Sequence, residues 1–169
     1  MRVASKASFD TMLESGRYLA HLHTSLTDGT NTVEEICGWA DGHGYEAVVF
    51  SEHIRREPTY SFDSYTNDIE CARTSCPGLE IWTGVEAKVF PGGGIDCGEE
   101  ILSRIDVLYI ACHGFSGGVD DWADSMRTAL GSSYGPTPIR VWAHPGRYLA
   151  GADCWLNALT SWQIYCITR

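Results

Sequence analysis

The amino-acid sequence predicts an α/β fold with a parallel sheet, and three features of the chain support this. Apolar runs of strand length alternate with segments whose apolar residues recur at helical spacing. The run AVVFSEH at 47–53 begins with four apolar residues, as expected for a strand buried on both faces. Thr32 and Glu35 have the spacing of a capping box just before a helical stripe. This alternation favours parallel strands with helices outside them. Six strands fit an open doubly wound sheet or a short β/α barrel, and the pattern leaves both possible.

The first half of the chain contains three predicted strands and two predicted helices. The strands are 18–24, 47–53 and 80–90, each rich in apolar residues and bounded by polar or glycine-rich stretches. A helix opens at Thr32 and stops at the glycines 42 and 44. Its apolar stripe has the spacing i, i+3, i+4, i+7 and consists of Val33, Ile36, Cys37 and Ala40. A second helix is expected within 61–75, before Pro77-Gly78.

The second half begins with a turn, PGGG at 91–94, and a short helix. Asp96 and Glu99 have capping-box spacing and predict the start of that helix. Helix 120–130 has an apolar face of Trp122, Met126 and Ala129. The remaining predicted elements are strand 107–114, strand 139–146, a helix around 148–159 and a last strand near 161–168.

Composition limits the classes of function. The 169 residues are expected to form a single domain, 1–169, with 44% hydrophobic and 20% charged residues. The net charge of −10 speaks against long nucleic acid and against a membrane surface as partners. The sequence has no signal-peptide core and no transmembrane run. Seven cysteines without a CxxC pair predict a reduced, cytoplasmic protein.

Five of the six histidines fall at or near the ends of predicted strands. His21 and His23 lie late in the first strand, where a period of two places both imidazoles on one face. Glu86 lies late in the third strand, and three further strands end in His53, His113 and His144. His43 alone falls elsewhere, at a helix end on the surface. Ligands of parallel β/α folds bind at the carboxyl ends of the strands, and imidazole and carboxylate suit zinc, iron and manganese. The pattern therefore predicts a metal site.

Five stretches of the chain together resemble the polymerase and histidinol phosphatase (PHP) family of metal-dependent phosphoesterases. They follow the family's order and span about residues 18–147: HLHTSLTDG (21–29), SEH (51–53), GVEAKVFPGGGID (84–96), IDVLYIACHGF (105–115) and VWAHPG (141–146). The HxH-plus-DG and GVE elements are specific in combination.

The resemblance implies a distorted (β/α)7 barrel with two to three divalent cations, zinc, manganese or iron, in its mouth. His21 and His23 would bind one cation, and Glu86 would bridge it to a second that His113 and His144 also hold. Asp28 and His53 would serve a third. The family's last strand, with an Asp-x-His element, has no counterpart here, so the barrel is expected to be truncated to about six strands. The first and third sites would each lack one ligand, and the open barrel edge could support a homo-oligomer.

The resemblance implies hydrolysis of a phosphate ester by a metal-activated water, with Glu86 and His113 as the catalytic residues. Arg147 and Arg55 are the candidate substrate-binding side chains, because guanidinium groups bind phosphate well. Cys112 is not expected to act as a nucleophile, since neighbours in a strand face opposite sides. Trp82 and Trp142 are expected in the core.

Two alternatives stay open. An amidohydrolase would also place HxH on a barrel strand, but the chain lacks the late strand-end aspartate of that class and has Asp153 only in a helix-like stretch. The domain could instead be a non-catalytic, metal-stabilised binding module. The expected partner is a small phosphorylated substrate.

Overall fold

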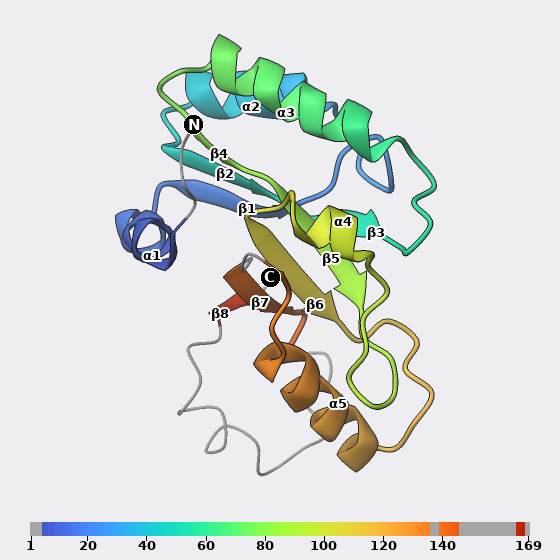
Figure 1. Ribbon diagram of the computed structural model, residues 1–169. Coiled ribbons are helices and arrows are strands. Elements are labelled where there is room, and N and C mark those ends of the chain that lie inside the picture. Colours follow the sequence, from blue (N-terminus) through green and yellow to red (C-terminus); the bar gives the residue numbers. More distant parts are fainter. Residues whose placement is uncertain (1–4, 136–138, 146–164, 168–169) are drawn as a thin grey trace.

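Parallel strands and flanking helices build the molecule, as seen in a computed structural model (Figure 1). The structure describes residues 5–135, 139–145 and 165–167. Its helices are α1 (Lys6–Ser15), α2 (Val33–Gly42), α3 (Phe62–Ser75), α4 (Glu99–Leu102) and α5 (Val119–Gly131). Its strands are β1 (Tyr18–Leu22), β2 (Ala47–Phe50), β3 (Glu52–Ile54), β4 (Glu80–Trp82), β5 (Gly84–Lys88), β6 (Val107–Ala111), β7 (Ile139–Ala143) and β8 (Tyr165–Ile167).

The strands pair in parallel in two sheets, ordered β1-β2-β4 and β3-β5-β6-β7-β8. Two predicted strands each contribute to both sheets, because each is interrupted by one residue. Ser51 separates β2 from β3, and Thr83 separates β4 from β5. Among the described residues, β1 and β4 are the edge strands of the first sheet, and β3 and β8 are those of the second. The predicted parallel α/β architecture is confirmed, and the pairing seen does not close a barrel.

Both faces of the strands are buried, and alternate residues face the two parts of the core. Leu108 and Ile110 of β6 pack in the outer core between the sheets and the helices, where α2 and α3 lie side by side over the first sheet (Figure 1). Val107 and Tyr109 of the same strand belong to the inner core. The inner core also includes Phe9 of α1, whose ring packs edge-on against Trp82 at 5.3 Å between centroids.

Several predicted elements are confirmed closely. Thr32 caps α2, its hydroxyl accepting from the Glu35 N–H while the Glu35 carboxylate accepts from the Thr32 N–H. Helices α3 and α5 lie where the sequence predicts them. Trp82 and Trp142 are buried as expected. His43 is exposed at the end of α2, also as expected. No helix among the described residues is long and apolar enough to cross a bilayer.

Other predictions were wrong or fall outside the described residues. Helix α1 was not predicted, and α4 starts at Glu99 with Gly98 as its N-cap, because the Asp96 carboxylate accepts from the Arg56 N–H instead. Most paired strands end one to three residues before the predicted bounds, whereas β3 ends one residue beyond its bound. His21 and His53 therefore lie within strands, and His23, His113 and His144 follow strand ends. The predicted helix around 148–159, with Asp153, lies outside the described residues, as does Arg147.

Candidate metal centre

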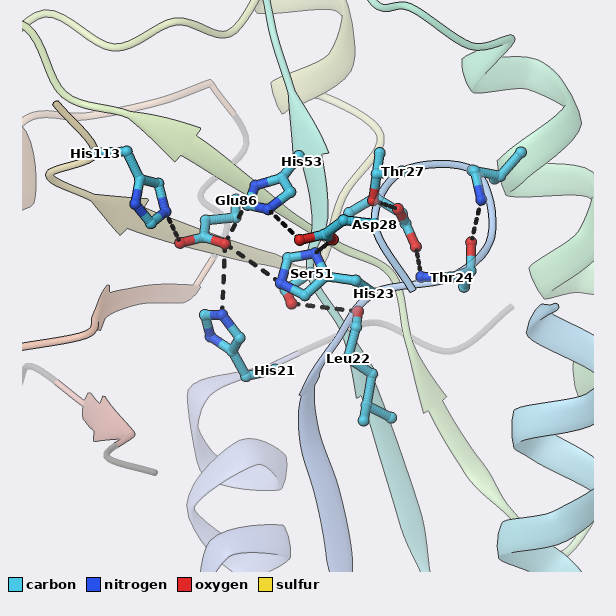
Figure 2. A network of polar contacts seen from close by, with 12 residues as sticks. His21, Leu22, His23, Thr24, Thr27, Asp28, Ser51, His53, Glu86 and His113 are labelled. Atoms are coloured by element: carbon cyan, nitrogen blue, oxygen red, sulfur yellow. Dashed lines mark hydrogen bonds and ion pairs between the residues drawn. The ribbon is translucent and has the colours of Figure 1, made fainter. Parts of the chain in front are cut away.

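Glu86 lies at the middle of the candidate site, in the centre of β5. Its neighbours Val85 and Ala87 face the outer core, so the Glu86 side chain points to the opposite, inner side of the sheet. Only 1% of its surface is exposed. Figure 2 shows imidazoles from several elements converging on this carboxylate. The alternation of one short strand therefore places a buried carboxylate at the site.

All five strand-end imidazoles contact Glu86, and they divide between its two oxygens. Oε1 lies 3.0 Å from His113 Nε2 and 3.2 Å from His144 Nε2. Oε2 lies 3.4 Å from one ring nitrogen of each of His21, His23 and His53. The structure thus joins residues from four different strand ends around one side chain.

Two of these histidines have left-handed backbone conformations, with φ of 59° at His21 and 54° at His144. His21 is the extra residue of an irregularity in β1, where Ala20 pairs with Val49 but Leu22 pairs with Phe50. Non-glycine residues in this region are uncommon and are found preferentially at functional sites. His21 and His23 both reach the carboxylate of Glu86, as expected. Simple strand alternation does not produce this arrangement, because β1 has a bulge at His21.

Asp28 belongs to the same network through two histidines. Its Oδ1 lies 3.6 Å from His23 Nδ1, and its Oδ2 lies 3.4 Å from His53 Nε2 (Figure 2). The following Gly29 is required sterically, since a Cβ atom there would lie 2.1 Å from the His23 carbonyl oxygen. The Asp-Gly pair is therefore both a tight turn and the carrier of a carboxylate at the site.

Electrostatics inside the cluster keep Glu86 ionised. Burial opposes the charge on Glu86, but the contact with His21 and the nearby His53 and His113 outweigh it, lowering its pKa to about 2. Burial, followed by repulsion from His53, lowers the pKa of His23 to about 4. A carboxylate and a neutral imidazole are the protonation states in which these groups bind metals.

The donor atoms fit a cation better than they fit one another. His21 Nε2, His23 Nδ1 and Glu86 Oε2 are buried and make no hydrogen bond. Buried polar atoms normally have partners, so atoms without one need an explanation. The 3.4 Å separations around Oε2 are long for a hydrogen bond. Ligand atoms bound at about 2.1 Å to one tetrahedral ion lie roughly 3.4 Å apart. The site therefore has the donor chemistry and spacing of a metal centre.

Three overlapping groups of described residues could each hold an ion: His21, His23 and Glu86; His23, Asp28 and His53; and His53, Glu86 and His113. The first matches the predicted grouping, and the second adds His23 to the predicted pair of Asp28 and His53. The third joins His53 to Glu86 and His113, and the predicted ligand His144 lies on the same oxygen of Glu86 as His113, 3.2 Å from Oε1. All seven predicted ligands nevertheless lie in one connected cluster.

The candidate substrate-binding residues lie at the edge of this cluster or outside the described residues. Arg55 is exposed directly after β3, the strand that contains His53. The ammonium of Lys88 approaches Gly114, where a Cβ atom would lie 3.9 Å from Nζ. Cys112 packs in the outer core away from His113, and burial raises the pKa of its thiol to about 12. A thiol in this state is a poor nucleophile, as the sequence predicts.

Sequence reasoning missed one buried charged residue beside the site, Glu52. Its carboxylate accepts hydrogen bonds from the Thr24 N–H and from the Thr27 hydroxyl. Burial raises the pKa of Glu52, while both hydrogen bonds oppose that shift. Its position between Ser51 and His53 was the available signal, but the sequence does not show which face of β3 is buried.

Comparison with known proteins agrees with the geometry. Residues 19–130 match the PHP domain family. The chain is 20% identical over 138 residues to the DNA polymerase/3'-5' exonuclease PolX of Bacillus subtilis (strain 168). That match covers 78% of this chain and 24% of PolX, so the chain spans about a quarter of its relative's length.

Proposed function

The chain belongs to the PHP domain family, and from this premise we propose that it hydrolyses a phosphate ester with two or three divalent cations. The proposed ligands are His21, His23, Asp28, His53, Glu86, His113 and His144. The proposed fold is the family's distorted β/α barrel, of which the parallel sheets are the described part. Zinc, manganese and iron all suit this set of imidazole and carboxylate donors.

The division of five histidines between the two oxygens of Glu86 is the observation that supports this proposal most. Oε1 faces His113 and His144, whereas Oε2 faces His21, His23 and His53. A carboxylate with nitrogen donors around each oxygen has the arrangement expected of a ligand that bridges two cations. Its low pKa keeps both oxygens available above about pH 2.

Cations held here would activate a water near neutral pH and neutralise charge on the phosphate oxygens. The protein's own residues would then fix the geometry. Glu86 is buried, and its Oε1 lies within hydrogen-bond distance of His113 Nε2, at 3.0 Å. These two residues are accordingly the ones we assign to catalysis.

Basic side chains at the strand ends would bind the phosphate. Among the described residues, Arg55, Arg56 and Lys88 form neither an ion pair nor a hydrogen bond through their side chains. Arg55 and Arg56 directly follow β3, and Lys88 is the last residue of β5. These side chains lack such partners among the described residues although the chain has 22 acidic residues. We assign Arg55 and Arg147 to substrate binding, and Lys88 is a further candidate.

The substrate class is a small phosphate monoester or diester. The name of PolX includes a 3'-5' exonuclease, which cleaves phosphodiesters, so diesters belong among the test substrates. The net charge of −10 disfavours a long nucleic acid, which binds best to a basic surface.

A panel of phosphate mono- and diesters, assayed with manganese, zinc or iron(II), tests the proposal. We expect turnover of at least one ester that falls by about 100-fold or more in Glu86→Gln and His113→Ala. His43→Ala is the matched control, because His43 is exposed at the end of α2 and should leave turnover unchanged. Metal binding without turnover of any ester would contradict the proposal and favour the non-catalytic binding module.

A further inference from the structure

Glu52 is a fully buried carboxylate that points away from the candidate cations. Adjacent residues of a strand face opposite sides, so β3 presents His53 to the site and Glu52 to the other side. There the Glu52 Oε2 accepts from the Thr27 hydroxyl at 2.5 Å, and Oε1 accepts from the Thr24 N–H. Burying a carboxylate is costly, so a role for its charge is expected.

The two donors lie in the loop that carries Asp28. This loop folds on itself, since the N–H groups of Thr27 and Gly29 both donate to the Thr24 carbonyl, at 3.1 and 3.0 Å. The Leu26 N–H donates to the Thr24 hydroxyl at 3.2 Å. Glu52 thus binds the loop at its beginning and again at the residue directly before Asp28.

The Asp28 side chain itself has little support from packing, because 66% of it is exposed. Its only contacts among the described side chains are the ones to His23 and His53. The position of its carboxylate therefore depends on the backbone of Thr27 and Gly29. Hydrogen bonds to charged acceptors are about twice as strong as neutral ones, which suits Glu52 for fixing that backbone.

We propose that Glu52 is a positioning residue that holds the 24–29 loop and thereby keeps the Asp28 carboxylate in place beside His23 and His53 for a cation. This inference rests on the proposed cation site, and it adds a residue that binds no cation itself. The strand β3 would then supply a ligand on one face and the support for a second ligand on the other.

Thr27→Val tests this, because valine has nearly the shape of threonine and lacks only the hydroxyl donor. The matched control is Thr30→Val, in the same stretch of chain, whose exposed hydroxyl donates to Asn31 Oδ1 and not to Glu52. Manganese is titrated into chelator-treated protein, and the free ion is measured by electron paramagnetic resonance. We expect Thr27→Val to weaken the weakest bound manganese by about 10- to 100-fold, and Thr30→Val to bind like the wild type.

The same titration in an Asp28→Asn background identifies the route of the effect. If Glu52 acts through Asp28, Thr27→Val causes no further loss of affinity there. An equal loss in both backgrounds, or unchanged binding in Thr27→Val, would overturn the inference. Absence of manganese binding by the wild type would overturn both the inference and the proposed function. Manganese binding with the expected Thr27→Val effect but no ester turnover would contradict only the phosphoesterase proposal.

Discussion

Glu86 combines deep burial with contacts to five imidazoles, and this gives the site its electrostatic character. A buried carboxylate alone would take up a proton readily, yet the surrounding histidines lower the pKa of Glu86 to about 2. Burial and repulsion from His53 lower the pKa of His23 to about 4, which keeps its imidazole uncharged. Both shifts favour the metal-binding protonation states at neutral pH.

Acidification should destabilise the metal-free protein through His23. The folded state keeps His23 neutral down to about pH 4, whereas the unfolded chain protonates it near 6.5. Between those values the unfolded state binds more protons, so the free energy of unfolding rises with pH and falls on acidification. Urea unfolding of chelator-treated protein should show a loss of roughly 2–3 kcal/mol between about pH 7 and pH 4 from this group.

The comparison of two histidine variants isolates that effect. His23→Asn should have a flatter dependence of unfolding free energy on pH, while His43→Asn should keep the wild-type slope because His43 is exposed outside the site. Glu86 adds a further loss only below its unfolded value of 4.5, as the pH approaches 2. An unchanged slope in His23→Asn would show that His23 is not held neutral by the fold.

At the scale of elements, the two sheets meet at Gly84, the first residue of β5. A Cβ atom there would lie 2.1 Å from the Phe50 carbonyl oxygen and 3.1 Å from that of Val107. Glycine therefore allows β5 to pass between the end of β2 and the start of β6. This passage sets the register that places Glu86 opposite Tyr109 and His53.

Gly84→Ala should lower the free energy of unfolding by about 2 kcal/mol or more, because the obstructing atoms belong to the backbone. Gly38→Ala is the matched control, since Gly38 is exposed in α2 with nothing within 4 Å of its Cβ position. That change should raise stability by about 0.5–1 kcal/mol. Chemical denaturation measures both, and equal effects would contradict the close approach at Gly84.

The elements that sequence predicts well are those with local signals. Thr32 and Glu35 define the start of α2 by a capping box, which needs no tertiary contact. Helix α1 has a Ser5 N-cap and a left-handed Gly16 at its C-cap, but Ser8 stands where the usual capping box has Glu or Gln, and Phe9 is buried by packing against Trp82. The breaks at Ser51 and Thr83 likewise depend on how the sheets bend together, which periodicity does not encode.

For the molecule as a whole, the inner core and the candidate site form one continuous layer. Tyr109 packs edge-on against His21, with ring centroids 5.0 Å apart, while other inner residues pack around Phe9 and Met12 of α1. The histidine positions were predictable because parallel strands bring their carboxyl ends together. The overlap of the groups was not, since His23 and His53 each contact both Asp28 and Glu86.

The metal content per chain tests the central claim most directly. Protein purified without chelator or a metal-binding tag is analysed by plasma mass spectrometry, with Glu86→Gln as the comparison. The account predicts about two or more equivalents of a transition metal in the wild type and a large loss in the variant. Less than about half an equivalent, not restored by added zinc or manganese, would contradict a metal centre built on Glu86.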